Sequence, residues 1–375
     1  MLASAAVFLD TALYAALTPL LPEFAEEYGL SKGASGLLVA AYPAGVLLGA
    51  VPAGIAAARL GPKSATVVGS LLLAAASVGF ALAPSAPVLA AARVGQGLGS
   101  ALTWAGALAW LVAVTSAERR GQVLGTALGG AIFGAVFGPV LGALASGLGT
   151  APTFTGVAVL AFSLAGWALA SPGAGREQVD FRAVRVASRE RLFLAGLALM
   201  VLPALLFGVL NVLPPLRLDA AGWGAAAIGA VFLIGASLEA VLSPLIGRLA
   251  DRRGRLLPVR VGLIASLLVS LALATAGRPI VIGVLVVAAA LAYGALLPPG
   301  LALVSDGAAR SGLAQGLAFG LMNAAWATGA AVGPALAGAL SDRTGDAIPF
   351  LLCAVLSLAA FAAAAPRTLA PRVKA

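Results

Sequence analysis

The chain contains no histidine, a single cysteine and few charged residues. Without histidine it lacks the commonest metal ligand, general base and proton shuttle. The lone Cys353 excludes a disulfide framework and any site built from several cysteines. Charged residues make up 10% of the 375 residues, against about 25% in an average soluble protein. So few charges cannot cover a surface that faces water, which excludes a soluble enzyme.

What the sequence has instead is apolar residues in long blocks. Hydrophobic residues make up 61% of the chain, and its mean hydropathy is +1.05. The period-two alternation of barrel strands is missing, whereas apolar runs of about 18 residues or more indicate membrane-spanning helices. We therefore expect an all-α membrane protein with twelve transmembrane helices, at 2–22, 35–58, 64–84, 87–114, 122–146, 151–171, 192–213, 228–248, 256–276, 280–304, 314–338 and 348–366.

The longest polar break, 172–191, follows six spans and precedes six more. We interpret 1–171 and 192–375 as two six-helix bundles, joined by this break as a linker. The linker is expected to be a solvated loop whose basic charges lie near lipid headgroups.

Basic residues are concentrated in alternate breaks. Of the 23 lysines and arginines, 18 lie on the side of the N-terminus, four lie on the other side, and Arg93 lies within a span. Because cytoplasmic loops are rich in Lys and Arg, both termini are predicted to be cytoplasmic. Topology thus accounts for the net charge of +9, and no nucleic-acid partner is expected. The excess of arginine over lysine is typical of a GC-rich bacterial genome and favours a bacterial inner membrane.

The two halves resemble each other at a fixed offset. Gly125, Gly134 and Gly138-Pro139 recur 195 residues later as Gly320, Gly329 and Gly333-Pro334. GIAAARLGPK, which follows the second span, recurs 193 residues later as GRLADRRGRL. Such a duplication predicts a substrate site between the halves, near the middle of the bilayer.

These motifs together resemble the major facilitator superfamily, and within it the drug:proton antiporters with twelve spans. GRLADRRGR (247–255) is similar to the loop signature of the superfamily, and RVGQGLGSA (93–101) to its fourth-span signature. The fifth-span glycine pattern and an aspartate nine and twelve residues before two prolines in the first span resemble the antiporter group. The chain departs from the pattern at Ala58, where the first-half loop would carry an acid.

The resemblance implies two pseudo-symmetric six-helix bundles that carry a small-molecule substrate and protons across a lipid bilayer. It implies a monomer that uses no cofactor and no metal.

Three ionisable side chains lie inside spans: Asp10, Arg93 and Glu239. A charge at the membrane centre costs about 2.5–3.5 kcal/mol, so each is expected to face a cavity or a partner. Neither acid has a counterpart in the other half, which favours function, although fixed pairing with Arg93 would also explain them. A carboxylate removed from water can bind a proton reversibly near neutral pH. Arg93 keeps its proton, and we expect it to tune an acid or to bind an anionic substrate group.

Neutral polar and aromatic residues complete the candidate proton and substrate site. Gln96 lies one helical turn from Arg93, and Asn323 lies one turn from Trp326. Trp104, Trp110, Trp167 and Trp326 are expected to be packing or interface anchors, with lining of the cavity as an alternative for Trp326.

Two further groups of residues are candidates for conformational roles. At the cytoplasmic end of the eighth span, Asp251 is expected to pair with Arg310 when the inner side closes, although the arginines there would also serve topology alone. This candidate cytoplasmic gate comprises Gly247, Asp251, Arg252, Gly254, Arg255 and Arg310. The glycine-proline rows are expected to kink their helices and form a tight seam, or simply to pack; they comprise Gly134, Gly138, Pro139, Gly142, Gly333 and Pro334.

The function predicted from these features is proton-coupled efflux of small lipophilic or cationic organic compounds. Two alternatives stay open: symport or facilitated diffusion of a sugar-like or anionic solute, and a membrane-embedded enzyme or sensor.

Overall fold

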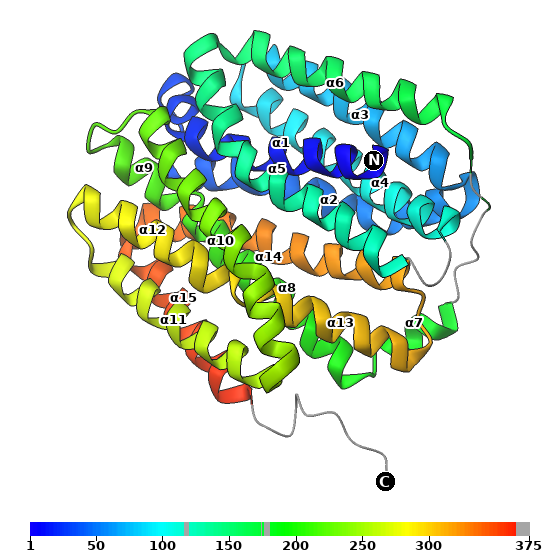
Figure 1. Ribbon diagram of the computed structural model, residues 1–375. Coiled ribbons are helices and arrows are strands. Elements are labelled where there is room, and N and C mark those ends of the chain that lie inside the picture. Colours follow the sequence, from blue (N-terminus) through cyan, green and yellow to red (C-terminus); the bar gives the residue numbers. More distant parts are fainter. Residues whose placement is uncertain (116–119, 174, 176–180, 365–375) are drawn as a thin grey trace.

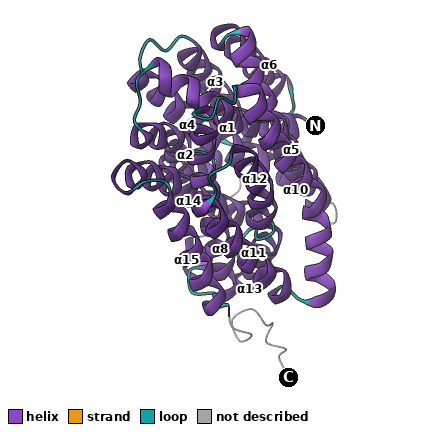
Figure 2. Ribbon diagram, turned by 90° about the vertical axis from the view of Figure 1, so that its left-hand side faces the viewer, coloured by secondary structure: helices purple, strands orange, loops and turns teal. Residues whose placement is uncertain are grey.

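The structure is a computed structural model that describes residues 1–115, 120–173, 175 and 181–364. Within these residues the chain consists of helices joined by short loops (Figure 2). In chain order they are α1 (Leu2–Glu27), α2 (Lys32–Leu60), α3 (Pro62–Ala81), α4 (Ala86–Val114), α5 (Arg120–Leu148), α6 (Thr150–Ala170), α7 (Phe181–Ala187), α8 (Arg191–Leu210), α9 (Leu213–Asp219), α10 (Ala225–Arg253), α11 (Leu256–Thr275), α12 (Pro279–Gly294), α13 (Leu297–Ser311), α14 (Gln315–Thr344) and α15 (Ala347–Ala363).

The all-α membrane fold predicted from the sequence is confirmed. Nine segments of the described chain are long and apolar enough to cross a membrane, counting α8–α9 and α12–α13 as one segment each. The other three predicted spans correspond to α4, α14 and the shorter α15. In Figure 1, α1–α6 occupy the upper part of the view and α8–α15 the lower part.

The tenth span differs from the expectation of one continuous helix, and the seventh continues past its predicted end at residue 213 as a second, short helix. The seventh is divided into α8 and α9, and the tenth into α12 and α13. Pro214 and Pro215 begin α9, and Pro298 and Pro299 begin α13. Proline has no N–H, so each pair leaves two carbonyl groups in the preceding turn without their helical donors. The paired prolines therefore account for both interruptions.

The two ends of the bundle are distinguished by the loops that meet there. We call the end that contains the start of α1 and the end of α15 the terminal end, and the other the opposite end. At the terminal end Leu2 packs near Val67, Trp110 and Ala168. At the opposite end the loop before α2 contacts the last turn of α14.

The linker 172–191 is not a loop throughout, because it contains the short helix α7. Ala183 and Ala187 of α7 are buried in a cluster with Phe193 of α8 and Val304 and Ala308 of α13. The small apolar side chains between the arginines of the linker explain this packing, which holds α7 against the second half at the terminal end.

The glycine row of each half packs against the first spanning helix of the same half. A Cβ atom at Gly134 of α5 would collide with the carbonyl oxygen of Phe8 in α1. In the second half, a Cβ at Gly329 or Gly333 of α14 would collide with the carbonyl oxygens of Val201 and Leu205 in α8. Glycine lets these backbones touch, and the equivalent contacts in the two halves agree with the internal repeat.

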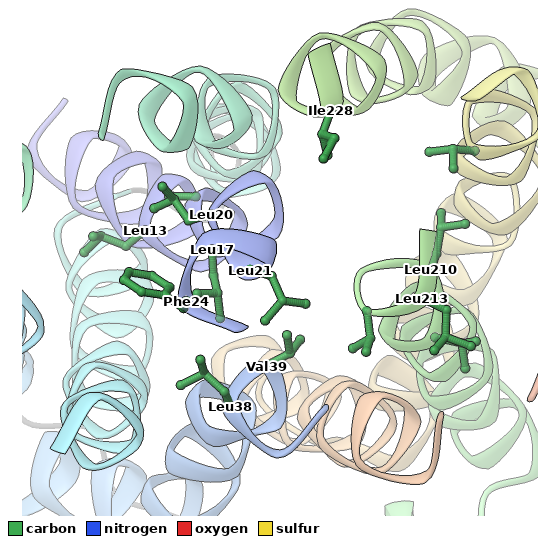
Figure 3. Packing of buried hydrophobic residues seen from close by; sticks show 14 of the residues in the cluster. Leu13, Leu17, Leu20, Leu21, Phe24, Leu38, Val39, Leu210, Leu213 and Ile228 are labelled. Carbon is green, nitrogen blue, oxygen red and sulfur yellow. The ribbon is translucent and has the colours of Figure 1, made fainter. Parts of the chain in front are cut away.

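An apolar cluster at the opposite end joins the two halves. Figure 3 shows Leu21 of α1 and Val39 of α2 on one side of this region, with Leu210 and Leu213 across from them and Ile228 on α10. All five belong to one buried cluster. Buried apolar side chains of both halves therefore meet in this part of the bundle.

Replacing Gly134 by alanine is expected to destabilise the fold, because the new Cβ meets backbone that cannot rotate away. Overpacking of this kind costs about 1–3 kcal/mol. Gly129→Ala in the same helix is the matched control, since nothing lies within 4 Å of a Cβ there. Thermal unfolding in detergent should show a lower Tm for Gly134→Ala only, and equal Tm values for the two variants would contradict the seam.

Candidate functional site

The carboxylate of Asp10 lies at the centre of the first half. Asp10 is on α1 and is 3% exposed. Its Oδ1 accepts a hydrogen bond of 2.5 Å from the Tyr42 hydroxyl of α2. Its Oδ2 accepts bonds of 2.9 Å from Ser100 Oγ and 2.7 Å from Trp104 Nε1, both on α4. Two helices thus supply three donors to one buried carboxylate on a third helix, and we call these four residues the Asp10 cluster.

Arg93 lies beside this cluster but is bonded to other groups. Its guanidinium donates to the backbone oxygens of Leu13 and Tyr14 and to Oε1 of Gln96, and it stacks 4.7 Å from the ring centre of Tyr42. No ion pair between Asp10 and Arg93 occurs among those found in the described residues. Arg93 therefore acts on Asp10 as a nearby charge, not as a salt-bridge partner.

Gln96 connects Arg93 to a third helix. Its Oε1 accepts from Arg93, and its Nε2 donates to Ser77 Oγ on α3 at 3.2 Å. The predicted proximity of Gln96 and Arg93 is thus present, and the amide fixes the arginine side chain within the first half.

Trp326 of α14 approaches the cluster from the second half. Its ring meets Tyr14 edge-on with 5.1 Å between centroids, and Tyr14 lies 5.4 Å from Tyr42. These rings share a small cluster with Val46 and Ala327. The aromatic rings therefore form a contact between the halves directly beside the carboxylate.

A cavity of about 330 Å³ lies in the terminal-end part of the bundle, between the halves. It is lined by α2, α4 and α14, and by the linker and the loop after α13. Trp104 and Asn323 are the lining residues whose side chains carry a polar group, among those described. Ala58, where the superfamily motif has its acid, also lines it. The cavity suits an apolar molecule with little hydrogen-bonding capacity.

Glu239 is separate from this arrangement. It lies on α10, and its carboxylate packs where a Cβ of Gly294 would otherwise be, at the end of α12. No contact described in the structure joins it to the Asp10 cluster. The space left by Gly294 places this acid at the interruption between α12 and α13.

The loop motif at the terminal end shows one ion pair in the described residues. Arg255 Nη2 lies 2.6 Å from Asp306 Oδ2 of α13. Gly254 ends α10 with φ of 81°, and Gly61 ends α2 with φ of 94°, a backbone conformation that favours glycine. Asp251 is in the last turn of α10, but its side chain lies outside the described residues, so its pairing with Arg310 stays a prediction.

At the opposite end the two halves are joined by polar contacts. Asp342, near the end of α14, accepts hydrogen bonds from the Ser31 hydroxyl and from the backbone N–H groups of Lys32 and Gly33 at the start of α2. These donors hold the pKa of the Asp342 carboxyl below its usual value of 3.8. The Lys32 ammonium also lies 2.6 Å from Asp346. The Asp342 carboxylate of the second half thus caps the start of α2 in the first half.

Four residues of the Asp10 cluster region were not identified from the sequence: Tyr14, Tyr42, Ser100 and Trp104. A sequence signal existed for two of them. Ser100 and Trp104 follow Arg93 by seven and eleven residues, which places them on the same face of α4. Trp104 was expected to be a packing or interface anchor, and the structure instead directs its N–H at Asp10.

Comparisons with known proteins agree with this architecture. The sequence model of the Major Facilitator Superfamily matches residues 3–318. A chloramphenicol resistance protein of Streptomyces lividans is 33% identical over 368 residues, which cover 92% of this chain and 91% of that protein.

Two solved structures share the fold. A bacterial homologue of the human lysosomal transporter Spinster, inward-facing and unoccupied, has a TM-score of 0.79 at 16% identity and covers 98% of this chain and 96% of its own. A D-xylose-proton symporter has a TM-score of 0.78 at 16% identity, and the match covers 100% of this chain and 97% of the symporter.

Asp342→Asn is expected to weaken the closure of the opposite end, because a neutral amide accepts the three hydrogen bonds less strongly. Labels at the start of α2 and the end of α14 should show about a threefold rise in the separated population, the scale of a weakened helix cap. The exposed neighbour Arg343→Gln is the control.

The same contact has a defined pH dependence. Because the pKa of Asp342 is lowered in the closed form, its contribution to closure is fully present above pH 3.8 and is lost as the pH falls below that value. A label distance that is insensitive both to Asp342→Asn and to acid would remove Asp342 from the closure.

Proposed function

Because the chain belongs to the Major Facilitator Superfamily, we propose that it is a transporter that exports small lipophilic or cationic organic compounds in exchange for protons. The observation that carries this proposal is a buried carboxylate with neutral donors, Asp10, next to an apolar cavity that both halves line. The similarity to a chloramphenicol resistance protein of Streptomyces lividans supports a drug as the transported molecule.

The proposed transport cycle alternates access between the two ends. The bundles 1–171 and 192–375 rock about the site, and the linker 172–191 permits the motion. The excess of basic residues at the terminal end favours a cytoplasmic location for it, with both termini, in a bacterial inner membrane. In the conformation described here the halves pack together at the opposite end and the cavity lies at the terminal end, for which we propose the cytoplasmic side. This is the arrangement in which an exporter takes up its substrate.

Asp10 is proposed to carry the transported proton. Its donors stabilise the ionised carboxylate, while its removal from water favours the neutral acid. Such opposed influences allow one group to exchange a proton at each side. Arg93 and Gln96 fix the electrostatic surroundings of Asp10, and Asn323 and Trp326 contribute to substrate contact from the second half.

The glycine rows and the terminal-end loop are proposed to control the motion. Gly138, Pro139 and Gly142 continue the seam of α5 along α1, where Cβ atoms at the two glycines would collide with Ala15 and the carbonyl oxygen of Ala16. The seams let each half move as a unit. At the terminal end, Asp251 is proposed to strengthen the closed form together with Gly247, Arg252 and Arg310. The pair of Arg255 and Asp306 joins the turn between α10 and α11 to α13.

The cavity disfavours the alternative of a sugar-like or anionic solute. A sugar needs many hydrogen-bonding side chains, and the described lining supplies two. Arg93, the candidate anchor for an anion, is 1% exposed and donates to Leu13, Tyr14 and Gln96. Neither the lining nor the arginine therefore presents groups to such a solute in this conformation.

Export is tested by growth of expressing cells on a panel of toxic compounds that includes chloramphenicol, with and without an uncoupler. Protection that the uncoupler abolishes supports the proposal. Protection unaffected by the uncoupler, together with uptake of the compounds in inside-out vesicles that ignores a proton gradient, would contradict it.

Asp10→Asn is expected to abolish uphill, proton-driven transport, because an amide cannot release a proton. Downhill exchange of chloramphenicol across liposomes without a gradient should persist, since the apolar cavity is unchanged. Asp219→Asn, an exposed acid at the opposite end, is the control and should transport like wild type. Uphill transport by Asp10→Asn at the wild-type rate would remove Asp10 from the mechanism.

Glu239→Gln is expected to alter the pH profile of transport or the preference for cationic over neutral compounds, because it removes a charge beside the α12–α13 interruption. Gly294→Ala is the companion variant: its Cβ displaces the carboxylate without changing its chemistry. If both variants keep the wild-type pH profile and cation preference, the role of Glu239 is structural.

A further inference from the structure

Trp104 contacts three parts of the protein at once. Its indole N–H donates to Asp10 Oδ2 at 2.7 Å, and the side chain lines the cavity. It also packs against a cluster whose buried members include Leu108 of α4 and Phe319 of α14, so it reaches the second half. One side chain therefore lies between the carboxylate, the cavity and the other bundle.

We propose that Trp104 is the positioning residue that makes substrate in the cavity and a proton on Asp10 exclude each other, for a lipophilic, ring-bearing substrate. The proposal rests on the proposed export function and assigns its coupling step to one hydrogen bond. No covalent step is involved: the proton moves between water and the carboxylate, and the indole keeps its own hydrogen.

The chemistry of the three donors distinguishes Trp104 from the other two. The hydroxyl groups of Tyr42 and Ser100 can each rotate and accept a hydrogen bond, so either tolerates a proton on the carboxylate oxygen that it faces. Indole N–H is a donor only. A protonated carboxyl can donate its new hydrogen to either hydroxyl, whereas Trp104 can only go on donating to an oxygen that has lost its negative charge and accepts more weakly. Protonation therefore weakens the Trp104 contact selectively.

A released indole can turn into the cavity that it already lines and reduce the space for substrate. Conversely, a substrate ring that packs on the docked indole holds its N–H on Asp10 and so favours the ionised carboxylate. Coupling between two ligands is reciprocal. Substrate binding then lowers the affinity of Asp10 for its proton by the same factor by which the proton lowers the affinity for substrate. Antiport requires this mutual exclusion, because the two ligands must be carried in turn.

The groups around Asp10 do not provide another route for this coupling. Within the described part of the chain, the ionisable side chains next to it are Tyr42 from α2 and Arg93 from α4, and Tyr14 of α1 packs on Tyr42. Where α5 packs on this part of α1, it presents Gly134, and α14 presents Trp326. Arg93 is held by bonds to backbone and Gln96, so it has no contact with the cavity lining.

Trp104→Phe tests the proposal, because it keeps an aromatic ring but removes the N–H. Chloramphenicol binding to purified protein is measured between pH 5 and 9, together with proton release on binding, read by a pH dye in weak buffer. Wild type should bind more weakly in acid and release protons on binding. In Trp104→Phe both effects should shrink about tenfold, the scale of a lost hydrogen bond to a charged group.

Two companion variants separate coupling from folding. Ser100→Ala removes a reversible donor to the same oxygen and should lose much less proton release than Trp104→Phe. Trp167→Phe replaces an exposed tryptophan of α6 and should behave as wild type. Proton release by Trp104→Phe equal to that of wild type would overturn the proposal, as would equal losses in Ser100→Ala and Trp104→Phe.

A readout without substrate separates this proposal from the export function. In protein labelled with 5-fluorotryptophan, the resonance of Trp104 is assigned as the one that Trp104→Phe lacks. This resonance should shift with pH in the wild-type protein and should not shift in Asp10→Asn. If the Trp104 resonance shifts with pH in this way but no compound of the panel is transported, the proposed export function is wrong, and the contact between Trp104 and Asp10 is confirmed. A resonance that does not respond to pH contradicts the contact itself.

Discussion

A carboxylate enclosed by apolar helices has no water to accept hydrogen bonds from, and the protein must supply every donor itself. Around Asp10 this requirement fixes the positions of α2 and α4 relative to α1, because Tyr42, Ser100 and Trp104 reach the carboxylate from those two neighbouring helices. An unpaired buried charge would cost several kcal/mol. The arrangement of the first half around its carboxylate is therefore determined by hydrogen bonding, while apolar packing fills the remaining volume.

Close approach of backbones is the second requirement, because donors on short side chains reach only short distances. Gly45 of α2 and Gly97 of α4 allow the two helices that carry the donors to touch, as a Cβ at either position would collide with backbone of the other helix. The glycine rows of α5 and α14 do the same for α1 and α8. Small residues substitute here for the hydrophobic effect, which contributes little between helices that are surrounded by lipid.

The sequence predicted the spans, the all-α fold and the superfamily well, because length and hydropathy are local properties. It also singled out Asp10, Arg93 and Gln96, because polar residues in apolar spans are conspicuous. It did not identify Tyr42 or Trp104 as partners of Asp10. In a helix that is apolar on all sides no periodicity reports which face meets a neighbour, so the orientation of α2 and α4 is set by contacts distant in sequence. The division of α12 from α13 was visible in Pro298 and Pro299, but span length alone concealed it.

The two ends of the bundle are closed by different kinds of contact, and this difference bears on the direction of transport. The opposite end combines an apolar cluster with the carboxyl groups of Asp342 and Asp346, which bond across the halves. The terminal end holds an apolar cavity with Trp104 at its wall. A lipophilic molecule enters such a cavity from the inner leaflet or the cytoplasm without losing strong hydrogen bonds to water. Its exit requires the polar contacts of the opposite end to separate, so energy must be supplied at that step. In the export cycle that we propose, a proton that reaches Asp10 from outside supplies this energy, because neutralising the carboxylate weakens the bonds that hold α1, α2 and α4 in the substrate-receiving arrangement.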